Sequence, residues 1–157
     1  MNAPRTIGAE QADPDLGQLV DSLGFLLRLA QLGAFGLFYE RLAQTGVKPG
    51  EYSVLYVIRR NPGIRQGVLA QRLLIKRAHM TKLIRHLEGQ SLIARHIPDD
   101  DRRAVELTLT QAGETLVAAH EQDMLDQAGH ESERLTGDEA RQLIGLLRKF
   151  TGIEERT

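Results

Sequence analysis

The sequence predicts a mostly α-helical domain that carries one small β-hairpin. Three observations predict this fold class. Apolar residues recur at three- and four-residue steps along most of the chain, the period shortens to two around residues 93–109, and two short helical segments come directly before that stretch. Two short helices followed at once by a two-stranded hairpin form a winged helix-turn-helix. We expect a single domain over residues 16–157 behind a disordered polar tail, residues 1–15.

A long amphipathic helix is predicted at the start of the domain. Its apolar residues recur at helical spacing from residue 16 to residue 42. A stretch with glycine and proline, residues 46–50, ends this helix and begins a second one, which stops at the Asn-Pro-Gly sequence of residues 61–63. The apolar face of the first helix is broad enough to need a partner.

Two further helices are predicted after the hairpin. Thr110 is placed as a helix N-cap, and a Thr-x-x-Glu capping box begins at Thr136. We therefore expect a winged helix-turn-helix over residues 47–110 between dimerisation helices over residues 16–45 and 111–150. The apolar faces of the flanking helices are best buried against a second copy of the chain.

The two short helices of the winged unit are expected to have different roles. The first, residues 66–73, is expected to bury Val68, Leu69 and Leu73. The second, residues 76–89, has apolar residues at i, i+3, i+4 and i+7, so one stripe faces the core. The remaining face consists of Ala78, Thr81, Lys82 and Arg85, with Lys76 and Arg77 at the first turn. A face that is small at its start and cationic beyond suits a helix in a DNA groove.

The charge distribution points to the same segment. The net charge is only −1, but residues 59–103 hold eleven Lys or Arg and four Asp or Glu, whereas the rest of the chain holds nine basic and seventeen acidic residues. A compact basic segment in an acidic frame indicates a polyanionic partner for that segment. The alternative is a solvated cationic face on a structural helix.

Several function classes are excluded or disfavoured. The chain has no cysteine, which excludes disulfides, thiol nucleophiles and thiol-based redox sensing. It shows no nucleophile–base arrangement, phosphate-binding glycine loop or metal triad, so we expect neither an enzyme nor a cofactor. The spacing of His120, Glu121, Asp123 and His130 does not assemble a metal site. No apolar run reaches the roughly 20 residues of a membrane span and no signal peptide is apparent, so we expect a cytoplasmic protein.

Short motifs run through the winged unit. They are Leu69-Ala70-Gln71-Arg72-Leu73, Met80-Thr81-Lys82-Leu83-Ile84, Leu87-Glu88, Ser91-Leu92-Ile93, Arg95, Asp101-Arg102-Arg103, Val105, Leu107 and Leu109-Thr110-x-x-Gly113. With them the chain resembles the multiple-antibiotic-resistance regulator (MarR) family of bacterial transcription factors over about residues 20–150. The acidic-Arg-Arg sequence followed by Leu-Thr-x-x-Gly is the most specific part. Ser91 departs from the family, which usually has glycine there, and serine fits at a modest cost if its backbone is left-handed.

The resemblance implies a homodimer that binds a pseudo-palindromic operator in double-stranded DNA and represses transcription. The expected contacts in the major groove are Lys76, Arg77, Ala78, Thr81, Lys82 and Arg85. Arginine suits guanine O6 and N7, so Arg77 is the first choice for a base contact. At the hairpin tip the resemblance implies that Asp101 braces the hairpin by a salt bridge while Arg102 or Arg103 enters the minor groove. Arg65, at a helix start, is a candidate phosphate contact.

The resemblance also implies a site for a small effector among the first two helices. Six of the seven aromatic residues lie there. The candidate site comprises Arg28, Phe35, Phe38, Tyr39, Tyr52 and Tyr56, which suits a small organic anion such as an aromatic acid or its coenzyme A thioester. Alternatively, long core helices simply attract aromatic residues. A regulator without a small-molecule effector, an activator, and a protein-interaction module without DNA binding also stay open.

Overall fold

The computed structural model describes residues 14–99, 101–125 and 135–153. The chain divides into two compact units, residues 1–32 and 33–157, and each is described by itself. Most of the predicted polar tail, and His130 of the rejected metal group, lie outside the described residues.

The first unit contains a short 3₁₀ helix and the beginning of a long α-helix. These are η1 (Gly17–Asp21) and α1 (Leu23–Leu42). The prediction of one unbroken helix from residue 16 is wrong here, because Ser22 takes an extended backbone with φ −79° and ψ 113° between the two elements. Asp21 and Ser22 are residue types whose side chains compete with the backbone for hydrogen bonds, which disfavours a helix interior.

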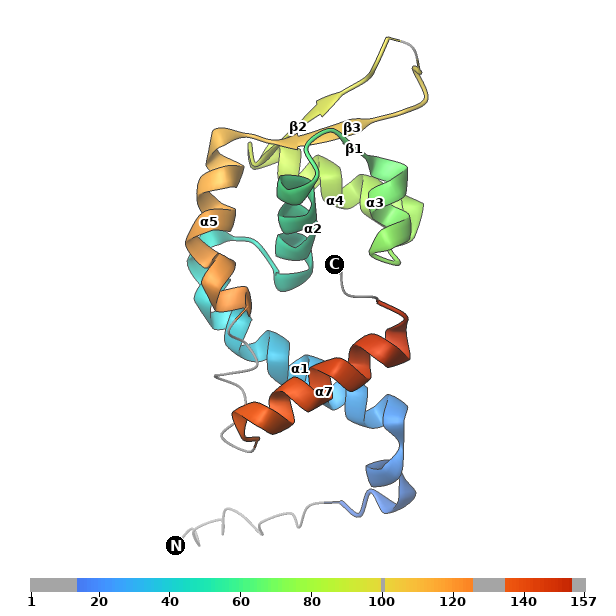
Figure 1. Ribbon diagram of the computed structural model, residues 1–157. Coiled ribbons are helices and arrows are strands. Elements are labelled where there is room, and N and C mark those ends of the chain that lie inside the picture. The colour runs from blue at the N-terminus through green and yellow to red at the C-terminus, as the bar shows by residue number, and fades with distance from the viewer. Residues whose placement is uncertain (1–13, 100, 126–134, 154–157) are drawn as a thin grey trace, which may run out of the picture. The chain divides into compact units, whose positions relative to one another are not determined.

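The second unit contains the winged part of the chain. After α1 ends through η2 (Ala43–Thr45), the helices are α2 (Pro49–Arg60), α3 (Gln66–Arg72), α4 (Arg77–Gly89), α5 (Gln111–Leu125) and α7 (Gly137–Thr151). In Figure 1, α2 lies between α5 on one side and α3 with α4 on the other, and a small sheet crosses its end. The predicted order of helices and hairpin is confirmed.

The sheet has three antiparallel strands in the order β1-β3-β2. The predicted hairpin is formed by β2 (Ile93–His96) and β3 (Glu106–Leu109), with Arg95 opposite Leu107. The third strand, β1 (Ile64–Arg65), was not predicted, because two residues are too few to show an alternating pattern. It pairs with β3 and so attaches the start of α3 to the hairpin. We call residues 93–109 the wing.

The core lies among α2, α4, β3 and α5. Its buried members include Tyr52, Val54, Leu55, Ile58, Met80, Leu83, Ile84, Leu87, Leu107 and Val117. The apolar stripe predicted for α4 is therefore confirmed. The expectation that α3 buries Val68 is wrong: Leu69 is fully buried and Leu73 is half-buried, but Val68 is 47% exposed. With seven residues, α3 turns only one narrow face to the core.

The Leu-Thr-x-x-Gly motif closes the wing onto the turn after α4. Thr110 donates from its backbone N–H to the carbonyl oxygen of Leu92 at 3.1 Å and from its hydroxyl to that of Ser91 at 2.6 Å. A Cβ atom at Gly113 would lie 2.1 Å from the Leu92 carbonyl oxygen, which only glycine avoids. Ser91 has a φ of 59°, so its backbone is left-handed, the condition under which serine fits this turn at a modest cost.

Candidate nucleic-acid interface

Helix α4 separates an apolar face from a cationic one. Lys76 is its N-cap residue, and Met80, Ile84 and Leu87 are buried on the core side. The side chains predicted to face DNA lie on the other side, where Lys76, Arg77, Ala78, Lys82 and Arg85 are exposed and Thr81 is half-buried. His79, which was not among the predicted contacts, is exposed beside them.

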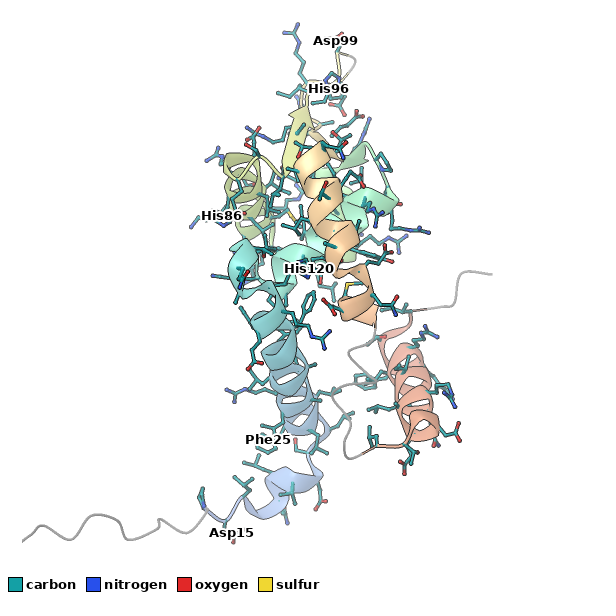
Figure 2. The ribbon with its side chains drawn as sticks, turned by 90° about the vertical axis from the view of Figure 1, so that its left-hand side faces the viewer. Asp15, Phe25, His86, His96, Asp99 and His120 are labelled. Atoms are coloured by element: carbon teal, nitrogen blue, oxygen red, sulfur yellow. The ribbon has the colours of Figure 1, made fainter. Side chains whose placement is uncertain are left out.

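The wing is braced at its tip and at its base. At the tip, Asp101 accepts a hydrogen bond from the backbone N–H of Arg103 at 3.2 Å and pairs with Arg65 at 3.5 Å. At the base, Arg95 pairs with Glu88 of α4 at 2.6 Å. Asp101 thus forms the salt bridge that the resemblance implied, with a partner at the start of α3. Arg102 and Arg103 stay exposed, and Figure 2 shows Asp99 at the outer end of the hairpin.

A groove of about 480 Å³ lies between α3, α4 and the wing. It is lined by Arg65, Gln66, Gly67, Val68, Ala70, Gln71, Arg77, Thr81, Asp101, Arg103, Ala104 and Val105. Five predicted site residues from three elements therefore meet here, among them three arginines. Ala78, Lys82 and Arg85 are exposed on α4 but do not line the groove. The excess of cationic groups suits a segment of sugar-phosphate backbone.

Gln66 is a groove residue that the sequence reasoning missed. Its backbone N–H donates to the carbonyl oxygen of Val105 in the wing at 2.8 Å, and its side-chain amide donates to the hydroxyl of Thr81 on α4 at 3.1 Å. One residue therefore connects α3, the wing and α4. The only sequence signal was a polar residue at the first position of a predicted helix, which is too common to single it out.

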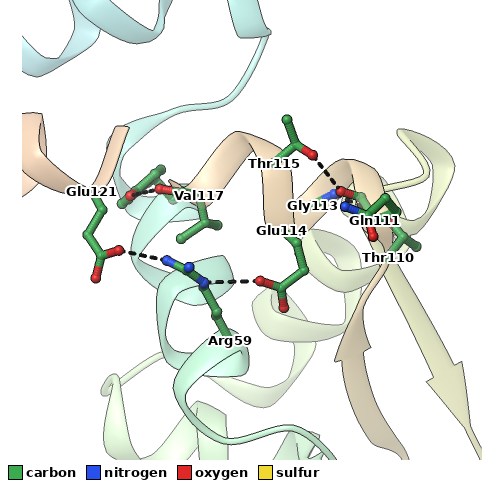
Figure 3. A network of polar contacts seen from close by, with 9 residues as sticks. Arg59, Thr110, Gln111, Gly113, Glu114, Thr115, Val117 and Glu121 are labelled. Carbon is green, nitrogen blue, oxygen red and sulfur yellow. Dashed lines mark hydrogen bonds and ion pairs between the residues drawn. The ribbon is translucent and has the colours of Figure 1, made fainter. Parts of the chain in front are cut away.

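A polar network holds α2 against α5, as Figure 3 shows. Arg59 bonds Glu114 through Nε at 3.0 Å and Glu121 through Nη1 at 2.7 Å. The hydrogen bond to Glu121 raises the pKa of the Arg59 guanidinium. Between these two contacts along α5, the carbonyl oxygen of Val117 accepts a hydrogen bond of 2.8 Å from the Tyr52 hydroxyl, and burial raises the pKa of Tyr52 to about 12. Because Arg59 is neutralised in this network, it adds little to the cationic face.

The aromatic residues proposed for an effector site differ in their accessibility. Phe38 and Tyr52 are core residues whose rings meet edge to face with centroids 5.2 Å apart. Phe35 and Tyr56 are half-buried and Tyr39 is exposed. Arg28 is exposed in the first unit. As described, Phe38 and Tyr52 offer no open surface, and both would have to move to touch a ligand.

Among the residues that the structure describes, no group of three or more His, Asp and Glu side chains could hold a metal ion. His120 pairs with Asp123, which also bonds Arg41. Within the same residues, no helix combines the length and the apolarity needed to cross a bilayer.

Comparison with known proteins relates this chain to a family of regulators. The MarR family profile matches residues 47–105, which contain α2, α3, α4 and most of the wing. A regulatory protein described for the hcr operon of Thauera aromatica is 38% identical over 152 residues, covering 93% of this chain and 92% of its own. The homoprotocatechuate degradative operon repressor of Escherichia coli is 25% identical, covering 85% of this chain and 90% of its own.

Solved structures agree with the sequence comparison. The transcriptional repressor CouR bound to a 23-mer DNA duplex matches with a TM-score of 0.80 and 29% identity, covering 89% of this chain and 99% of its own. CouR bound to p-coumaroyl-CoA matches with a TM-score of 0.78 and 27% identity, with the same coverage. A relative that is 38% identical over nearly the whole of both chains, together with the winged architecture, is decisive. The chain belongs to the MarR family of DNA-binding transcriptional regulators.

Proposed function

We propose that this protein is a homodimeric repressor that binds a pseudo-palindromic operator and is released from it by a small organic anion. The observation that carries the proposal is the groove between α3, α4 and the wing. Arg65, Arg77 and Arg103 reach it from three different elements. Groups that converge on one cationic surface from separate elements favour a polyanion over a merely solvated face.

In the proposed complex α4 lies in the major groove. Arg77, at its first turn, contacts a base, whereas Lys82 and Arg85 contact phosphates and set the register. The wing follows the adjacent minor groove, into which Arg102 or Arg103 extends. Arg65 has its guanidinium shared with Asp101, and the remaining donors suit a phosphate.

The proposed dimer rests on apolar faces that each unit leaves uncovered. In the first unit Leu19, Val20, Leu23, Leu26 and Leu29 are each about half exposed. On α7 of the second unit, Leu143 is 44% exposed and Phe150 is 64% exposed. Several large apolar side chains left exposed along one segment favour a protein–protein interface there. Light scattering at micromolar concentration should give twice the chain mass of 17.5 kDa, and a monomer mass would contradict the dimer.

The proposed effector is an aromatic acid or its coenzyme A thioester. The support comes from the homoprotocatechuate operon repressor and from CouR with p-coumaroyl-CoA, both similar to this chain. In this chain three aromatic side chains on α1 and α2 of the second unit have accessible surface. They are Phe35, Tyr39 and Tyr56. An effector acts only if it binds one arrangement of the two α4 helices in the dimer better than the other. A tenfold loss of DNA affinity needs about 1.4 kcal/mol of difference in its binding free energy.

The experiment begins with a DNA duplex that the protein selects from a randomised pool. Fluorescence anisotropy then follows release of this duplex by p-coumaroyl-CoA, p-coumarate, homoprotocatechuate and free coenzyme A. We expect an aromatic acid or the thioester to lower DNA affinity at least tenfold, with no effect of free coenzyme A. If none of the aromatic ligands changes the affinity, the effector class is wrong and the regulator without such a ligand becomes the better account.

A further inference from the structure

The hydroxyl group of Thr81 has little freedom left for contacts with DNA. It donates its hydrogen to the backbone carbonyl oxygen of Arg77 at 3.0 Å and accepts a hydrogen from the Gln66 amide at 3.1 Å. A threonine hydroxyl has one hydrogen and two lone pairs. Thr81 can therefore offer a base only its second lone pair and its methyl group.

These two remaining groups do not suit every base. In the major groove adenine N6 and cytosine N4 supply donors and thymine supplies a methyl group, whereas the guanine edge carries acceptors only. A fixed Thr81 is thus complementary to adenine, cytosine or thymine and finds no partner on guanine. The hydrogen reaches guanine only if the hydroxyl turns away from the Arg77 carbonyl. The bond accepted from Gln66 opposes that turn, because a hydroxyl that accepts a hydrogen bond donates its own hydrogen more strongly.

Gln66 is held where it can impose this restriction. Its backbone is fixed by the bond to Val105 of the wing, and its side chain is half-buried in the groove. The amide therefore reaches Thr81 from a separate, anchored element rather than from α4 itself. We propose that Gln66 is a specificity-determining residue that acts through Thr81 and excludes guanine at the base that Thr81 faces. This inference rests on the proposed docking of α4 in the major groove.

The test compares base preferences. Wild-type protein and the variant Gln66→Ala each select duplexes from the same randomised pool, and the bound sequences are read. Gln66→Ala should gain guanine at one position in each half of the selected sequence, with a change in relative preference of about tenfold and little change elsewhere. The matched control is Gln111→Ala, which removes an exposed amide from the first position of a different helix, α5, outside the groove lining, and should leave every preference unchanged.

Further variants distinguish an effect on base preference from an effect on protein stability. Thr81→Val has no hydroxyl, so adding Gln66→Ala to it should change the base preference no further. Thr81→Ser keeps the hydroxyl and should keep the exclusion of guanine. Equal preferences for wild type and Gln66→Ala, with melting temperatures alike, would overturn the inference while DNA binding stands. Failure of the wild type to select any sequence would overturn both this inference and the proposed function.

Discussion

Arg59 on α2 and Glu121 on α5 are joined by a hydrogen-bonded ion pair of 2.7 Å between Nη1 and Oε2. The same guanidinium bonds Glu114 two turns earlier, so one side chain spans the face of α5 that meets α2. Tyr52 bonds the backbone of α5 between these two points. Because α5 leads from the wing toward the C-terminal helix, this network fixes the winged part of the chain to the helix that follows it.

Replacement of Arg59 should loosen this attachment. Arg59→Ala leaves two carboxylates without their shared cation, so we expect a lower midpoint of urea unfolding. The double variant Arg59→Ala/Glu121→Ala should lose less than the sum of the two single variants, because both remove the same contact. Arg60→Ala, at an exposed neighbouring position, is the control. Strictly additive losses would show that the pair contributes nothing to stability.

The Tyr52 hydroxyl should make stability depend on alkaline pH. Its pKa of about 12 lies above the ordinary value of 10, so the folded state holds the phenol proton more tightly than the unfolded state. This contribution is complete below pH 10 and is lost as the pH rises through 12. Tyr52→Phe should cost about 1 kcal/mol at pH 8 by removing the bond to Val117. The difference should shrink at pH 11, whereas the exposed Tyr39→Phe should cost little at either pH. An equal cost of Tyr52→Phe at both pH values would refute the assignment.

Gly113 should not tolerate a side chain. A Cβ atom 2.1 Å from the Leu92 carbonyl oxygen forces backbone to move, and overpacking of this kind costs about 3 kcal/mol. Gly50→Ala is the matched control, because Gly50 lies in a helix and a Cβ there meets nothing within 4 Å. This variant should unfold with the same free energy as the wild type or with up to about 1 kcal/mol more. Thermal unfolding of both variants checks the contrast. A Gly113→Ala protein as stable as the wild type would mean that the close approach to Leu92 is not maintained in solution.

Replacing either of two residues with left-handed backbone by glycine should stabilise the protein. Ser91 has φ 59°, and Leu74, in the turn between α3 and α4, has φ 54°. The Leu74 side chain is 93% exposed, so its removal loses little packing. Glycine removes the backbone strain but also raises the entropy of the unfolded chain, which offsets part of the gain. Each replacement should therefore raise the free energy of unfolding by about 0.5–1 kcal/mol. Thr115→Gly, in the helical backbone of α5, should instead lose about 1 kcal/mol. A loss in all three variants would contradict the strain at positions 74 and 91.

The parts of the fold that follow from periodicity could be predicted from the sequence. The stripe containing Met80 and Ile84 and the alternation in the wing placed α4 and the hairpin. The features that were missed depend on tertiary contacts: β1 exists because Ile64 meets Leu107, and Val68 is exposed because α3 is short. No local pattern encodes either one.

The candidate site was predictable to the same extent. The cationic face of α4 follows from helical spacing, so Lys82 and Arg85 could be placed on it. Arg59 was counted with the basic segment, yet Glu114 and Glu121 neutralise it from 55 and 62 residues away in sequence. The bond from Gln66 to Thr81 likewise spans 15 residues and needs the folded groove.

The affinity of the wild-type protein for its selected duplex, relative to a scrambled duplex of the same composition at about 0.15 M salt, tests the central claim most directly. If α4 reads base edges while the wing and groove hold phosphates, the selected duplex should bind at least about 10³-fold more tightly. Arg77→Ala should reduce this ratio by about tenfold or more, whereas Arg103→Ala should weaken binding with less effect on the major-groove preference. Equal affinity of the wild type for both duplexes would contradict the account.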